Sequence, residues 1–299
     1  MFQQASAFNQ NIGNWNVSGV WNFEGMFWGA ESFNQDLGNW NPTSATSMAN
    51  MFKMTNNFDQ DLSGWNIAGV NAMANMFSGT PALSPTTKGE IHKTFSSNLN
   101  WPYDWSEFVV YELITDANFQ NAVNLWFSDE ANATYTYGHI SDWNVSQVTD
   151  MSNAFKDRST FNEDISGWDV SSVTDMRNIF HGAIMFNQSI GTWNVSSVTN
   201  MTSMFLGAAN FNQPLAAWDV SSVNTMFNMF HRAESFNSPI GQWDVSELTN
   251  TWSMFNGAKA FNQPIGSWNV SSVTNMTGMF NGATNFNQDL GDWNVYAVT

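Results

Sequence analysis

The sequence predicts a repeat solenoid made of 25-residue coils, each with a short parallel β-strand and a short helical segment. One observation is that tryptophan returns at intervals of 25 residues, in a group of three and a group of seven: Trp15, Trp40, Trp65, Trp143, Trp168, Trp193, Trp218, Trp243, Trp268 and Trp293. Another is that 42% of the residues are hydrophobic and 15% aromatic. A single coil is too short to bury its apolar face alone, so neighbouring coils must stack.

Each element of the coil follows from the spacing of its apolar residues. Residues 265–270 read I-x-x-W-x-V, which predicts a short strand with Trp and Val on its buried face. Ser271 or Ser272 can then cap a short helical segment by accepting from free N–H groups. Residues 273–280 place their apolar side chains on one face of that segment, and Gly282 stands where a left-handed residue ends a helix.

The asparagine of each Phe-Asn-Gln triplet is predicted to be structural. Its amide recurs at one position in successive coils, where it can satisfy backbone N–H and C=O groups of the neighbouring turn. The residues concerned are Asn9, Asn34, Asn187, Asn212, Asn262 and Asn287.

The repeat is interrupted between Trp65 and Trp143, which are 78 residues apart. Within this interval the sequence predicts a short helix around 88–95, followed by an aromatic run at Trp101, Tyr103, Trp105 and Phe108. Asp116 is predicted to cap a second, amphipathic helix, whose apolar residues are Phe119, Ala122, Val123, Trp126 and Phe127.

Because the end of an array exposes an apolar face, the interruption is interpreted as two caps. Residues 81–107 would close a first array, 1–107, and residues 108–142 would begin a second array, 108–299. The alternative is one continuous solenoid with a bulging insertion of 53 residues. The first and last coils look incomplete, so both ends are expected to be truncations of a longer array.

Composition limits the classes of partner. The chain has 25 acidic and 8 basic residues, a formal charge of −17, which leaves little basic surface for nucleic acid or an anionic membrane. There is no cysteine, no apolar run of about 18 residues that predicts membrane insertion, and no signal segment at the start.

The segments FNQDLGNW, WNVSSVTNM and MFNGA resemble the repeats of the BspA-like leucine-rich-repeat surface proteins, whose 25-residue units form a domain of unknown function. The resemblance covers about four fifths of the chain. It implies a leucine-rich-repeat-like solenoid that is secreted or on the cell surface and acts in adhesion, with a protein or glycan ligand. A spacer or surface-layer component is the alternative role.

No catalytic site is expected. The G-x-S-x-G, Gly-rich phosphate-loop and HExxH motifs are absent, and the chain has four histidines. His181 and His231 share a position two coils apart, roughly 10 Å at the spacing of strands, which is too far for one metal ion without further ligands. We therefore predict no enzyme activity and no catalytic cofactor.

A row of polar residues between the buried Trp and Val of each coil is the first candidate binding surface. Pleating would point these side chains out of the core, about 5 Å apart. We call it the Asn/Asp row; it consists of Asn16, Asn41, Asn66, Asn144, Asp169, Asn194, Asp219, Asp244, Asn269 and Asn294. Its members Asn194, Asp219, Asp244 and Asn269 are candidate partner contacts, and a merely solvated face is the alternative.

Two carboxylates of this row, Asp219 and Asp244, fall in consecutive coils. A Ca²⁺ ion could relieve their repulsion, because it prefers oxygen ligands. The alternative is that water and salt screen the exposed pair.

The second candidate surface comes from a departure from the repeat. Most coils have a small or polar residue directly after the conserved Met position that contains Met201 and Met276, whereas two consecutive coils have Phe227 and Trp252. We call these two residues the aromatic pair. Rigid rings at the surface suit a sugar or a protein contact. The alternative is that they lean inward and fill the space left where Thr251 replaces Met.

Overall fold

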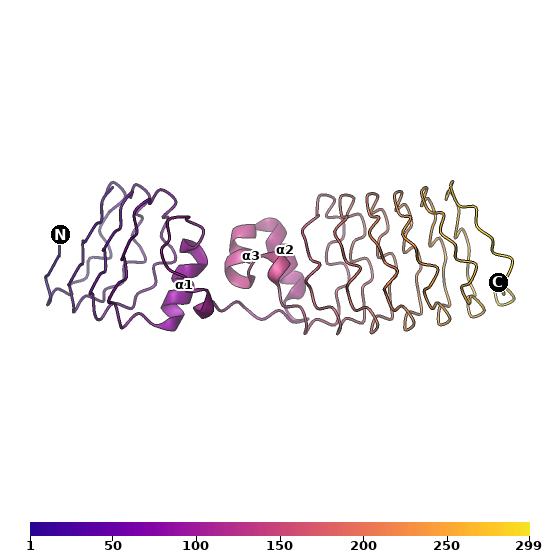
Figure 1. Ribbon diagram of the computed structural model, residues 1–299, viewed down its shortest axis with the longest axis horizontal. Helices are drawn as coiled ribbons and strands as arrows, with labels where there is room; N and C mark the ends of the chain where they lie inside the picture. Colours follow the sequence, from indigo (N-terminus) through magenta and orange to yellow (C-terminus); the bar gives the residue numbers. More distant parts are fainter. The chain divides into compact units, whose positions relative to one another are not determined.

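The computed structural model describes residues 1–299 as two compact units, Met1–Tyr111 and Glu112–Thr299. The first unit contains α1 (Pro85–Phe95) and the short 3₁₀ helix η1 (Ser106–Phe108). The second contains α2 (Phe119–Ser128), α3 (Glu130–Tyr137) and the 3₁₀ helix η2 (Ile140–Asp142). Elsewhere in each unit the chain runs in successive turns that lie side by side (Figure 1), and we call each 25-residue turn a coil.

Neighbouring coils are joined by backbone hydrogen bonds from alternate residues. The N–H groups of Met176, Asn178 and Phe180 donate to the carbonyls 24 residues later, at 3.0, 2.9 and 3.0 Å. The intervening residues bond locally, as Ile179 does to the carbonyl of Met176. The β-type pairing between coils consists of isolated parallel bridges, such as that of Asp175 with Asn200. No continuous strand or sheet forms. The predicted strand at I-x-x-W-x-V is therefore wrong, because this segment folds as tight turns.

The predicted helical segment within each coil is also wrong, and one position explains why. The residue two places after the first conserved Met has a positive φ, for example +57° at Asn178, +56° at Asn228 and +64° at Gly278. A left-handed residue in the middle of the segment cannot continue a right-handed helix. The amides that follow therefore alternate between a local bond, as at Ile179, and a bond to the neighbouring coil, as at Phe180. Gly282 does have the predicted left-handed conformation, with φ +71°.

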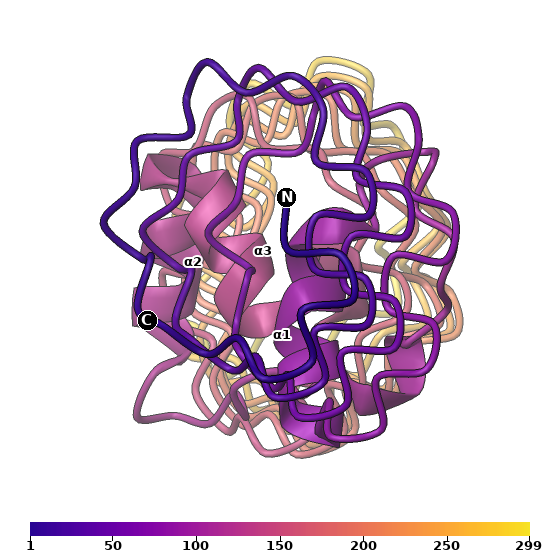
Figure 2. The same cartoon turned by 90° about the vertical axis from the view of Figure 1, so that its left-hand side faces the viewer.

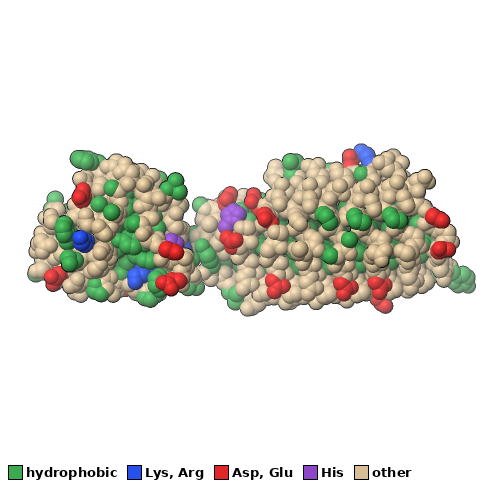
Figure 3. Space-filling model, viewed as in Figure 1, with side chains coloured by type: hydrophobic (Ala, Val, Ile, Leu, Met, Phe, Trp, Pro, Cys, Tyr) green, Lys and Arg blue, Asp and Glu red, His purple; other side chains and the backbone are tan.

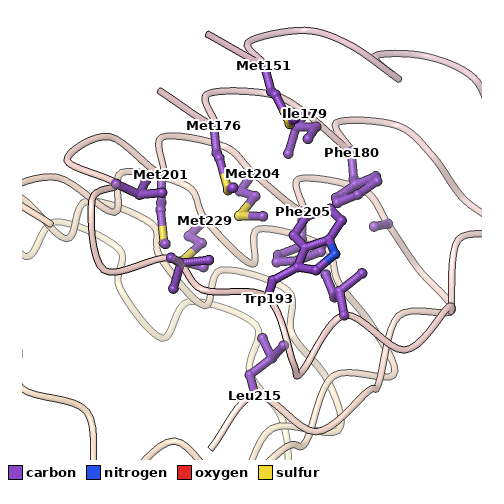
Figure 4. Packing of buried hydrophobic residues seen from close by; sticks show 14 of the residues in the cluster. Met151, Met176, Ile179, Phe180, Trp193, Met201, Met204, Phe205, Leu215 and Met229 are labelled. Carbon is purple, nitrogen blue, oxygen red and sulfur yellow. The ribbon is translucent and has the colours of Figure 1, made fainter. Parts of the chain in front are cut away.

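Each unit has a core of aromatic and methionine side chains that repeat from coil to coil. Seen end-on, the coils of the first unit surround a common interior (Figure 2). In the second unit the rings of Phe180 and Phe205 stack at 5.5 Å beside Trp193 and a column of methionines (Figure 4). The Nε1 atoms of the Trp residues from Trp168 to Trp293 each donate to a carbonyl 28 residues earlier, as Trp193 does to Ile165 at 3.2 Å, whereas that of Trp143 donates to Gly138. The repeated Trp, Phe and Met are thus core residues in nearly every coil.

The Phe-Asn-Gln asparagines have the predicted structural role. The Oδ1 atom of Asn9 accepts from the N–H of Asn34 at 3.0 Å, and that of Asn187 accepts from the N–H of Asn212 at 3.0 Å. The glutamine of the following coil adds a second bond in several places, for example Gln213 to Asn187. These amides connect neighbouring loops, so they belong to the framework.

In the first unit the last coil is covered by α1 and the aromatic run. The N-cap residue of α1, Ser84, donates to the carboxylate of Asp59. Asp59 stands at the position that Asn occupies in the Phe-Asn-Gln triplets of other coils. The hydroxyl oxygen of Tyr103 accepts from the N–H of Phe77 at 2.8 Å, where earlier coils use the carbonyl of the next coil. The side chain of Asn98 donates to two further carbonyls of the last coil.

In the second unit α2 packs on the first coil. Phe119, Ala122, Val123 and Trp126 are buried, as the apolar spacing predicts. The predicted cap is wrong, because Asn118 and not Asp116 is the N-cap residue. The carboxylate of Asp116 instead accepts from the N–H groups of Thr149 and Asp150, and so takes the place of a carbonyl in a preceding coil.

Candidate functional site

The Asn/Asp row is exposed throughout, but its members lie in short irregular segments beside turns and not on a sheet face. The Oδ1 atom of Asn194 accepts from the N–H and hydroxyl of Ser196, at 3.2 and 2.7 Å. Asp219 does the same with Ser221, at 3.1 and 2.6 Å, and Asn269 with Ser271. One oxygen of each residue therefore closes a local turn, and the rest of the side-chain group faces solvent.

Asp219 and Asp244 are close enough to interact electrostatically. Hydrogen bonds from the serine two residues later hold the pKa of each carboxyl below its usual value, and the charge of Asp219 opposes this at Asp244. Ca²⁺ commonly takes six to eight oxygen ligands, and no third acidic or histidine side chain joins these two. Binding of Ca²⁺ by this pair stays a prediction.

The acidic members of the row predict how stability depends on pH. Because Asp169, Asp219 and Asp244 have lowered pKa values when folded, their stabilising contribution is present above about pH 4 and is lost as the pH falls through the folded pKa. Replacing all three by Asn should reduce the drop in melting temperature between about pH 6 and pH 3. Asn194 and Asn269 make the same turns, so the fold is retained. Identical drops in the parent and the variant would contradict this assignment.

The aromatic pair lies on the surface of the second unit. The rings of Phe227 and Trp252 are 4.9 Å apart and tilted by 60°, so they do not stack face to face. Trp252 is 44% exposed and Phe227 is half-buried. The neighbouring Thr251 is buried, and its hydroxyl lies 3.6 Å from the sulfur of Met279. Trp252 therefore sits outside the core, and Thr251 itself occupies the Met position.

The candidate residues form two separate groups. Phe227 contacts Trp252, and Asp219 interacts with Asp244, but no hydrogen bond or ring contact joins one group to the other. The viewed surface is mostly uncharged, with scattered acidic side chains and few basic ones (Figure 3).

Sequence reasoning missed one concave region, beside α2 in the second unit. It is lined by Gln120 and Asn124 of α2 and by Asp150, Lys156 and Asp157 of the first coil. The available signal was a departure from the repeat, because Lys-Asp-Arg at 156–158 replaces the Asn-Gly-Ala found at 256–258 and 281–283.

The histidines do not form a site with one another. Partial burial lowers the pKa of both His181 and His231 below the usual value, and the two side chains interact only electrostatically. The chain has no group of three His, Cys, Asp or Glu side chains suited to a metal ion. None of its helices has both the length and the apolar character needed to cross a membrane.

Comparison with known proteins places the coils in a family. The family model described as "Mycoplasma protein of unknown function, DUF285" matches residues 1–89, 121–241 and 230–299. This is consistent with the resemblance to BspA-like repeats without identifying that group. No curated protein and no solved structure matches the chain. Since the three matches span well over half of its length, the chain belongs to the DUF285 family of repeat-containing proteins of unknown function.

Proposed function

We propose that this chain is a non-enzymatic binding module, a leucine-rich-repeat-like solenoid that acts in adhesion outside the cell or on its surface. Its partner would be a protein or a glycan, held by the aromatic pair and by the Asn/Asp row at Asn194, Asp219, Asp244 and Asn269. The exposure of Trp252 beside Phe227 carries the proposal. A core role gives no reason to keep an indole at the surface where most other coils have Ala, Ser, Thr or Arg.

The surroundings of the pair support this choice. Thr202 and Thr277 occupy the same position in the adjoining coils, so the pair is an apolar patch flanked by hydroxyl groups. Half-exposed rings bury considerable area on binding at small entropic cost. Asn250 and Asn275 are also partly exposed and lie two residues before Trp252 and Thr277. Amides and hydroxyls beside an aromatic ring provide the polar contacts that orient a ligand.

The test replaces Phe227 and Trp252 together by Thr, the residue found at this position in adjoining coils. The parent should bind members of a glycan array or an extracellular-protein array. The variant should lose at least tenfold in affinity, about 1.4 kcal/mol, with an unchanged melting temperature. Calorimetric titration of the best array hit measures the difference.

Trp21→Thr is the matched control. Trp21 is 66% exposed and lies in the first unit, and Thr46 occupies its position in the next coil. This variant removes an exposed indole without touching the pair, so it should bind like the parent. If the parent binds nothing on either array, a spacer or surface-layer role is favoured. If the double variant loses several kcal/mol of stability, the rings serve packing.

A further inference from the structure

A groove between α2 and the first coil of the second unit has the dimensions of a ligand site. Its volume is about 880 Å³, within the range of small-molecule sites, about 300 to 1,000 Å³. Gln120 and Asn124 line it from α2, and Ser152, Lys156 and Asp157 line it from the coil. We call it the cap groove. It shares no residue with the aromatic pair or with the Asn/Asp row.

The coil that borders the cap groove departs from the repeat at three consecutive residues. Later coils read Phe-Asn-Gly-Ala at 255–258 and 280–283, whereas this coil reads Phe-Lys-Asp-Arg at 155–158. Packing explains only Arg158. Its guanidinium lies 4.4 Å from the centre of the Phe127 ring and donates to the Oδ1 of Asn124 at 3.2 Å, so it holds α2 against the coil.

Lys156 and Asp157 have no such structural role. Both are exposed, and neither side chain makes a hydrogen bond or an ion pair. Asp157 has a left-handed backbone conformation, with φ +59°, which Asp tolerates better than most residues. Gly182 of the next coil leaves room for its side chain. A Cβ at Gly182 would lie 2.7 Å from the Oδ1 of Asp157. Lys156 and Asp157 therefore line the groove with polar groups that make no hydrogen bond or ion pair within the protein.

The lining indicates the class of ligand. It combines hydrogen-bond donors on Lys156 and Asn124 with acceptors on Asp150, Asp157 and Gln120. A hydroxyl group both donates and accepts, so a ligand rich in hydroxyls fits this mixture. Asp116, Asp150 and Asp157 against one ammonium disfavour an anion. We propose that the cap groove binds a neutral oligosaccharide, as a second ligand site independent of the aromatic pair.

The test uses Lys156→Asn with Asp157→Gly, which restores the Asn-Gly of later coils and so preserves the fold. Neutral tetrasaccharides of glucose, mannose, galactose and N-acetylglucosamine are titrated calorimetrically, with a sialylated trisaccharide as the anionic comparison. The parent should bind at least one neutral tetrasaccharide, and the double variant should bind it at least tenfold more weakly with an unchanged melting temperature.

Two further variants separate the possible causes. Gln120→Ala, on the exposed face of α2, should also weaken binding and serves if the coil variant folds poorly. Phe227→Thr with Trp252→Thr should bind the tetrasaccharide like the parent, which distinguishes this site from the proposed aromatic site. The proposal is overturned if no neutral tetrasaccharide binds, if only the sialylated sugar binds, or if the groove variants bind like the parent.

Discussion

Replacing Trp218 by alanine is expected to lower the free energy of unfolding of the second unit by about 3 to 5 kcal/mol. Trp218 is 3% exposed and stacks on Trp243, with ring centres 6.4 Å apart. Its Nε1 also donates to the carbonyl of Ile190 at 3.0 Å, so the substitution removes one of the two hydrogen bonds that this carbonyl accepts and also leaves a cavity. Urea denaturation followed by far-UV circular dichroism measures the loss.

Trp293→Ala is the control within the same repeat position. Trp293 donates to the carbonyl of Ile265 at 3.0 Å and lies 6.3 Å from Phe280, but its side chain is only half-buried. We expect it to cost less than half as much as the change at Trp218, because the lost burial is smaller. Equal losses for the two variants would contradict the interpretation that each core Trp is held between neighbouring coils.

The sequence predicted the framework of the molecule better than the backbone within each coil. The interval of 25 residues identified the buried Trp and Phe positions, and the apolar spacing identified α2. The strand and helix within the coil were wrong because periodicity reports which side chains are buried and not where the amides bond. A signal for the true backbone was present at one position, where Asn178, Asn228 and Gly278 are residue types that tolerate a positive φ.

Of the two candidate ligand sites, the sequence alone located the aromatic pair and not the cap groove. The aromatic pair was found from sequence because Phe227 and Trp252 depart from the repeat within one column. The cap groove was not, because Gln120 and Lys156 are brought together only by the packing of α2 on the first coil. The role of Asp116 was wrongly predicted for a related reason. Its hydrogen-bond partner Thr149 is 33 residues away, and local capping rules do not consider distant amides.

Gly89→Ala is expected to destabilise the first unit by about 3 kcal/mol, although Gly→Ala inside a helix ordinarily stabilises by about 1 kcal/mol. Gly89 is buried in α1 where η1 crosses it. A Cβ at this position would lie 2.1 Å from the carbonyl oxygen of Phe108 and 2.8 Å from its carbon. These are backbone atoms, so no side-chain rotation relieves the clash and η1 must move away from the helix.

The displacement should spread to the aromatic run that leads into η1. Trp101, Tyr103 and Trp105 pack against one another and against Phe77 of the last coil. We therefore expect faster hydrogen exchange in residues 77–108 of the variant, together with a lower urea midpoint for the first unit. Gly19→Ala is the control, because a Cβ there meets nothing within 4 Å. If Gly89→Ala stabilises the protein as a solvated helix position would, α1 and η1 are not in the close contact that covers the last coil.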